Sequence, residues 1–216
     1  MFFKAGQLYH VYNRGNQKQR IFFSPSNYQY FIRKMEKYIV PRADLLSWCL
    51  MPNHFHFLIS ANSSSDIFSD RRGMPIQNLS EGIRLLLSTY TKGFNRAMNL
   101  TGNLFQQRTK AKPLISDAGD YGLIAFNYIH QNPIKAKLVH KMEDWPYSSF
   151  KDYIGKRRKS MCNLNLAKQL FNLESAEVFY ENTLTMPIYN QVNEIFYPAR
   201  QQQGPKKSII ITPDEF

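Results

Sequence analysis

Two histidines that stand two residues apart, His54 and His56, are the side chains of this chain best suited to metal chemistry. They lie in the apolar run 48–59, which is typical of a strand. Because side chains alternate across a strand, both imidazoles point to one face, and Phe55 and Phe57 point to the other. Two imidazoles on one face of a rigid strand supply half of a divalent-metal site. The spacing alone equally allows two satisfied histidines at a sheet surface.

A tyrosine and an asparagine supply a matching nucleophile and a further ligand. Tyr128 and Asn132 are four residues apart at the end of an expected helix and are therefore neighbours on one helical face. A phenol is a weak nucleophile at neutral pH, but a metal that offsets the charge of a phosphate makes its attack feasible. Two nitrogen ligands favour Mn²⁺, whereas Mg²⁺ is the commoner partner of phosphates. Taken alone, Tyr128 reads as a packing residue and Asn132 as a helix cap.

The charge balance narrows the class of partner. Lys and Arg number 28 against 16 Asp and Glu, a formal net charge of +12, which favours a polyanion and most commonly nucleic acid. A soluble basic protein that binds no polyanion can have the same net charge. A hydrophobic content of 43% excludes a disordered chain, and no apolar run approaches the roughly 20 residues that span a bilayer.

The cysteines and the first residues indicate the cellular compartment. Cys49 and Cys162 make no disulfide framework and lie in no Cys-x-x-Cys zinc spacing. The first residues lack the basic-then-apolar order of a signal peptide. We expect a cytoplasmic, nucleoid-associated protein of bacterial type.

The elements that must position these residues follow from hydrophobic periodicity. A helix begins at Ser24-Pro25 and ends before Pro41. Asp117 caps a last helix that must stop near Pro133, with Asn132 in a distorted final turn. We further expect strands over 7–14, 44–51, 54–60 and 103–115, a helix over about 76–98, and a long, polar, mobile loop over 61–75.

This order predicts an α+β fold of the ferredoxin-like, split βαβ kind: an antiparallel sheet with two helices on one face, plus one more helix. Residues 1–153 form the expected catalytic domain, and residues 154–216 a C-terminal extension of uncertain order. The basic side chains that we expect to contact nucleic acid are Arg14, Arg84, Lys92, Arg96, Arg108, Lys110 and Lys135.

Four segments together resemble the REP-associated tyrosine transposases, the single-tyrosine branch of the HUH endonuclease superfamily. They are YHVYNRG over 9–15, MPNHFHFLI over 51–59, YIHQNPIKA over 128–136 and WPYSSF over 145–150. A chance His-x-His match is common, but four segments in this order and spacing are specific. The resemblance covers residues 1 to about 153.

The resemblance implies a role for each candidate residue. His54 and His56 would be the metal ligands and Asn132 would complete the site, with Mg²⁺ or Mn²⁺ bound. Tyr128 would attack a phosphodiester of single-stranded DNA, which forms a 5′-phosphotyrosine link and frees a 3′-hydroxyl, so that rejoining needs no ATP. Members of the family recognise imperfect hairpins in single-stranded DNA. His130 lies off the face of Tyr128 and would be structural or DNA-facing.

Two other functions stay open. One is a domesticated protein that binds a DNA or RNA hairpin without cutting it, and the other is a metal hydrolase that uses a bound water. The chain could act as a monomer or a homodimer, and in a dimer one site could combine histidines from one copy with the tyrosine of the other.

Overall fold

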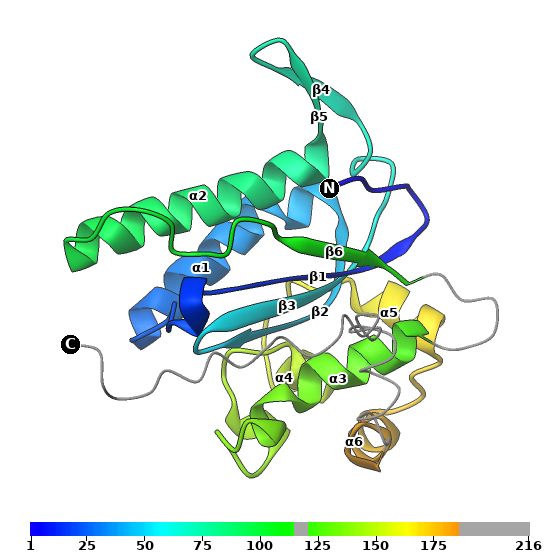
Figure 1. Ribbon diagram of the computed structural model, residues 1–216. Coiled ribbons are helices and arrows are strands. Elements are labelled where there is room, and N and C mark those ends of the chain that lie inside the picture. Colours follow the sequence, from blue (N-terminus) through cyan, green and yellow to red (C-terminus); the bar gives the residue numbers. More distant parts are fainter. Residues whose placement is uncertain (115–120, 186–216) are drawn as a thin grey trace, which may run out of the picture.

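A four-stranded antiparallel sheet forms the centre of the computed structural model, which describes residues 1–114 and 121–185 (Figure 1). The strand order is β2-β3-β1-β6, the order that the split βαβ connection produces. The expected fold class is therefore confirmed. The strands of this sheet are β1 (Leu8–Arg14), β2 (Asp44–Met51), β3 (His54–Ser60) and β6 (Lys110–Pro113).

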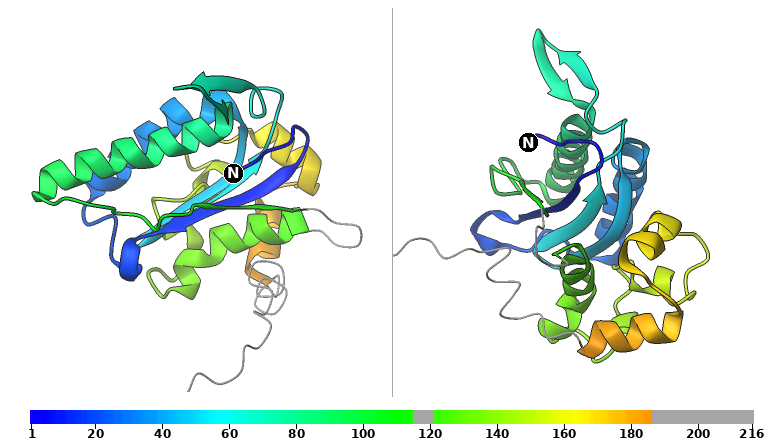
Figure 2. Two further views of the ribbon diagram at one scale, coloured as in Figure 1. Left: turned by 45° about the horizontal axis from the view of Figure 1, so that its top comes forward. Right: turned by 90° about the vertical axis from the view of Figure 1, so that its right-hand side faces the viewer.

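Two helices, α1 (Pro25–Tyr38) and α2 (Asn78–Met98), cover one face of this sheet (Figures 1 and 2). The alternation of β3 sends Phe55 and Phe57 toward them, where both are fully buried. Phe31 of α1 lies 5.5 Å from Phe55 and 5.0 Å from Tyr90 of α2, measured between ring centroids. This aromatic core fixes β3 and so fixes the opposite face, which carries the histidines.

A third helix, α3 (Tyr121–Lys135), packs on β2 and β3 from the opposite face (Figure 2). The sequence did not decide which face of the sheet this helix covers. Pro133 lies inside α3 and does not end it, because the helix continues to Lys135. Pro133 has no N–H to donate to the carbonyl four residues earlier, and only two residues of the helix follow it. The expected cap at Asp117 lies outside the described residues.

The expected loop over 61–75 is wrong in part, since its second half forms a hairpin. Strands β4 (Phe68–Arg71) and β5 (Met74–Gln77) pair antiparallel and project from the body of the molecule (Figure 1). Arg72 and Gly73 take positive φ angles of 53° and 78°, and Asp70 Oδ1 accepts a bond from the Gly73 N–H at 3.0 Å. Both strands are largely exposed, so no buried face marks them in the sequence.

The expected strand over 103–115 is shorter than predicted and spans only Lys110–Pro113. The preceding residues follow β1 without regular pairing, through bonds from Asn16 N to Leu104 O and from Gln106 N to Arg14 O, both 2.9 Å long. This irregular segment, residues 103–109, is therefore attached to the sheet edge.

Three helices beyond residue 149 lie on the α3 side of the sheet: α4 (Phe150–Tyr153), α5 (Leu164–Phe171) and α6 (Ala176–Thr185) (Figure 1). Phe179 of α6 is buried among Phe126, Phe150 and Tyr153, with ring centroids 5.2–5.7 Å away. The division of the chain at residue 153 stays a prediction. Short 3₁₀ helices complete the elements: η1 (Asn16–Lys18), η2 (Val40–Arg42) and η3 (Met142–Asp144). Within the described ranges, no helix has the length and apolar character to cross a membrane.

Candidate active site

The histidine face of the sheet, α3 and the 106–110 segment enclose a cavity of about 480 Å³. It brings both histidines of the predicted pair together with the predicted nucleophile and three of the predicted basic residues. The side chains that line it are Tyr12, Asn13, Arg14, His54, His56, Gln106, Arg108, Lys110 and Tyr128.

His54 and His56 lie side by side, with ring centroids 4.9 Å apart and planes at 87°. His54 Nδ1 lies 2.6 Å from the side-chain oxygen of Asn53. Because that oxygen only accepts, Nδ1 carries the proton and Nε2 keeps its lone pair. The turn residue Asn53 thus prepares His54 to be a ligand through Nε2.

A third histidine, which the sequence did not single out, contacts the Nδ1 of His56, and His56 Nε2 keeps its lone pair in the tautomer in which Nδ1 donates to it. His10 Nε2 lies 2.8 Å from His56 Nδ1, and the two rings are stacked with centroids 5.0 Å apart. His56 Nε2 is buried and has no hydrogen-bond partner among the described residues. A buried nitrogen without a partner is costly unless it has a further ligand, so the two imidazoles suit a divalent metal as a pair, although within the described residues no group of three or more His, Cys, Asp and Glu side chains is placed to hold one.

Burial keeps these imidazoles neutral. Desolvation, with a smaller effect of the Lys112 charge, lowers the pKa of His10 to about 3. Desolvation, followed by the charge of Arg14, lowers the pKa of His54 to about 4. Burial also lowers the pKa of His56 well below its usual value. Only a neutral imidazole binds a metal, so each ring has the required protonation state at pH 7.

Tyr128 faces these histidines from α3. Its half-buried ring lies 5.5 Å from the His56 ring at 80° and 6.2 Å from the His10 ring at 86°, between centroids. Lys135, one of the predicted basic residues, places Nζ 5.2 Å from the centroid of the Tyr128 ring. Burial lowers the pKa of this lysine. A hydroxyl-bearing ring therefore stands next to the candidate ligand His56, to His10 and to a cation.

Asn132 lies one turn after Tyr128, buried in α3. Its amide nitrogen donates to the Tyr128 carbonyl at 2.7 Å, which leaves the amide oxygen as the atom suited to a metal. Asn132 is not among the residues that line the cavity. The structure therefore brings His54, His56 and Tyr128 together at one cavity and leaves Asn132 outside its lining.

The remaining predicted basic residues lie elsewhere. Arg84 and Lys92 line a second, larger cavity that Arg108 also borders. The guanidinium of Arg84 donates to Glu81 at 2.6 and 2.5 Å. Arg96 lines neither cavity.

His130 has a structural role, which was one of its two expected roles. The ring is fully buried, and its Nε2 lies 2.8 Å from Ser149 Oγ. Aromatic rings of Phe126, Phe150 and Phe179 surround it at 4.8–5.7 Å. It therefore cannot face DNA in this arrangement.

Comparison with known proteins agrees with the sequence motifs. No family model matches the chain. A curated relative from Haemophilus influenzae, described as a REP-associated tyrosine transposase, is 28% identical over 102 residues. The match covers 47% of this chain and 56% of the relative, so the chain spans about half the length of that relative.

A solved structure, that of a REP-associated tyrosine transposase bound to a REP hairpin, matches with a TM-score of 0.51. The match covers 74% of this chain and 86% of that chain at 22% identity, and it therefore bears on the fold. The resemblance to REP-associated tyrosine transposases that the motifs indicated is confirmed.

Proposed function

We propose that this chain, like the REP-associated tyrosine transposases that it resembles, cuts and rejoins single-stranded DNA beside a hairpin. The observation that carries the proposal is the position of the Tyr128 ring, whose centroid lies 5.5 Å from that of the buried His56 ring. The Nε2 of His56 has no hydrogen-bond partner among the described residues. Arg14, Arg108 and Lys110 line the same cavity and suit a phosphate.

The residues that would hold the metal are His54 and His56 through Nε2, with Asn132 through its amide oxygen. When bound, Mg²⁺ or Mn²⁺ would polarise the scissile phosphate and offset its negative charge. Because all three ligands are uncharged, none of them reduces the charge available for the phosphate. The transposase description of the relative and the hairpin in the solved structure support DNA as the substrate.

The proposed reaction conserves the phosphodiester energy. The Tyr128 oxygen forms a bond to phosphorus and loses its proton, while the bond from phosphorus to the 3′-oxygen breaks and that oxygen gains a proton. The products are a 5′-phosphotyrosine and a free 3′-hydroxyl. Attack by a 3′-hydroxyl on the phosphotyrosine reverses these steps, so strand transfer consumes no nucleotide cofactor.

Replacement of the nucleophile tests this function. Single-stranded DNA from the flanks of the protein's own gene, incubated with Mg²⁺ or Mn²⁺, is expected to yield a covalent adduct that survives a denaturing gel. Tyr128→Phe removes the attacking oxygen and should abolish the adduct while hairpin binding persists. Tyr121→Phe, in the same helix but outside the cavity, is the matched control and should retain it. Undiminished adducts from Tyr128→Phe would overturn the assignment.

One observation favours the non-cleaving hairpin binder as a second candidate. The amide nitrogen of Asn132 is engaged by the Tyr128 carbonyl, and Asn132 does not line the cavity. For such a binder, EDTA leaves hairpin affinity unchanged and no hairpin is cut. For the transposase, EDTA abolishes the adduct. Cleavage that survives Tyr128→Phe would instead favour a hydrolase that uses bound water.

A further inference from the structure

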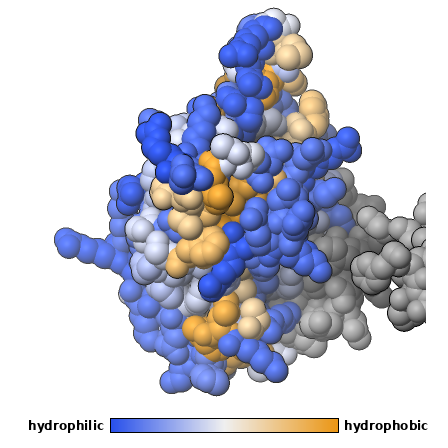
Figure 3. All heavy atoms as spheres, turned by 60° about the vertical axis from the view of Figure 1, so that its left-hand side comes forward, coloured by the Kyte–Doolittle hydropathy of each residue, from blue (hydrophilic) through white to orange (hydrophobic). Residues whose placement is uncertain are grey.

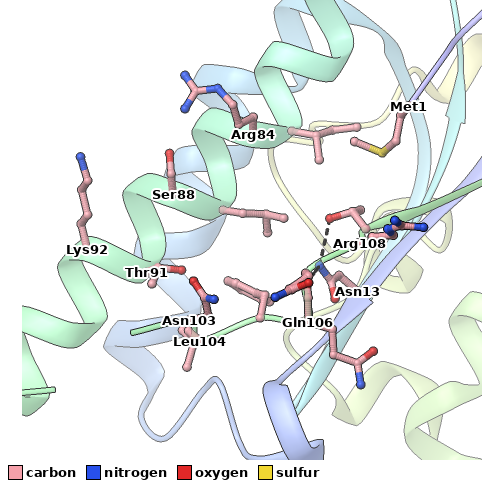
Figure 4. A pocket seen from close by; sticks show the side chains of 15 residues that line it. Met1, Asn13, Arg84, Ser88, Thr91, Lys92, Asn103, Leu104, Gln106 and Arg108 are labelled. Carbon is pink, nitrogen blue, oxygen red and sulfur yellow. Dashed lines mark hydrogen bonds between the residues drawn. The ribbon is translucent and has the colours of Figure 1, made fainter. Parts of the chain in front are cut away.

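We propose that a second groove, between α2 and the 103–109 segment, binds the unpaired strand that leads into the active-site cavity. The inference rests on the proposed function, because it takes single-stranded DNA as the substrate. The groove has a volume of about 830 Å³. In Figure 4, α2 provides one wall with Ser88, Thr91 and Lys92, and Asn103 and Gln106 extend from the opposite segment.

The groove and the active-site cavity adjoin each other and share part of their lining. Asn13, Gln106 and Arg108 line both of them. Asn13 also holds the shared wall in place, because its amide nitrogen donates to Gln106 O at 3.1 Å and to Thr109 Oγ1 at 2.9 Å. A DNA strand that lies along the groove therefore passes this fixed wall and reaches the cavity that Tyr128 lines.

The lining has a cation for the phosphates and amides for the bases. Lys92 and Arg108 are exposed, and neither forms an ion pair within the described residues. Because Arg84 forms an ion pair with Glu81, it adds less net positive charge to the groove. The exposed carboxamides of Gln106 and Gln107 can donate to and accept from base edges.

These features favour an unpaired strand over a duplex. Base edges are fully accessible to carboxamides only when the bases are unpaired and can be splayed out. The floor of the groove is apolar and includes Ile83, Leu87 and Leu104, which suits the faces of unstacked bases. Figure 3, seen from the side on which α2 ends, shows hydrophobic residues gathered in a band with hydrophilic residues on both sides.

The test compares two DNA molecules that differ only in the flank. One is a blunt hairpin, and the other is the same hairpin with its native unpaired flanks. Both are titrated against Tyr128→Phe protein, so that no cleavage disturbs the binding. Lys92→Ala should weaken binding of the flanked hairpin about tenfold and lower its log–log salt slope by about 0.7, the value for one single-strand phosphate contact. Affinity for the blunt hairpin should not change.

Two further variants sharpen the comparison. Ser88→Trp, which fills the groove from a half-buried position on α2, should also weaken only the flanked hairpin. Lys37→Ala, an exposed cation on α1 outside both cavities, should change neither affinity. Equal losses on both DNA molecules, or no loss on either, would overturn the groove assignment. Because the readout is binding, a protein that forms no adduct can still show the flank-specific loss, so the two proposals fail separately.

Discussion

At the scale of single residues, the contact between His10 and His56 decides which nitrogen of His56 is available to a metal. The two nitrogens, 2.8 Å apart, share one proton. When His56 Nδ1 carries it, His56 Nε2 keeps the lone pair that a ligand needs. In that tautomer His10 positions His56 and is not itself a ligand of the proposed metal.

Replacing His10 should affect metal binding to a degree that depends on whether the new side chain still accepts a hydrogen bond from His56 Nδ1. His10→Phe removes the acceptor, and we expect Mn²⁺ affinity, measured by calorimetry without DNA, to fall about 10–100-fold. His10→Gln offers a carbonyl oxygen to the same proton and should restore most of the affinity. An equal loss in both variants, with unchanged thermal stability, would contradict the positioning role.

The structure brings together the candidate residues that local geometry relates, and the sequence missed the one whose contact depends on strand pairing. The alternation of one strand places His54 and His56 on one face, with no knowledge of other strands. His10 meets His56 only because β1 pairs with β3 so that Tyr12 lies opposite His56. That register is a long-range property, and no local pattern in the sequence specifies it.

At the scale of elements, α6 packs onto α3, the helix that carries the proposed nucleophile. Phe179 is 3% exposed, and Thr183 Oγ1 donates to Asn127 Oδ1 at 2.8 Å. Asn127 directly precedes Tyr128 in α3. The fold of the first 153 residues therefore gains part of its core from the extension.

Truncating Phe179 should test this packing. Phe179→Ala removes a buried ring and should lower the free energy of unfolding by about 3–5 kcal/mol. Leu184→Ala, on the same helix but 51% exposed, should change it by less than about 0.5 kcal/mol. Chemical denaturation of the two variants gives both values, and similar small effects would show that α6 does not share the core.

Periodicity predicted the elements that bury apolar side chains and failed where such burial is missing. The β1, β2 and β3 strands and the α1 and α2 helices agree with prediction to within about two residues because each buries apolar side chains. The β4–β5 hairpin is largely exposed and depends on its turn residues. Its Asp70-Arg71-Arg72-Gly73 sequence was the only local sign of that turn.

At the scale of the whole molecule, the net charge of +12 pointed to a polyanion but not to its place of binding. The fold gathers Arg14, Arg108 and Lys110 at the active-site cavity and Lys92 at the groove, although they come from distant parts of the chain. Lysines and arginines elsewhere, such as Arg96, line neither cavity. Only the three-dimensional structure distinguishes the basic residues that line a cavity from those that line neither.

The short distance from Tyr128 to His56 within one chain has a consequence for mixtures of inactive variants. Because one copy holds both the proposed nucleophile and the histidine pair, Tyr128→Phe protein mixed with His56→Ala protein should not complement, and the mixture should form no adduct at any ratio. Titrating Tyr128→Phe into active protein should likewise leave the yield per active copy unchanged when DNA is in excess. Adducts in the mixture of the two variants would mean that copies exchange α3 and build each site from two chains.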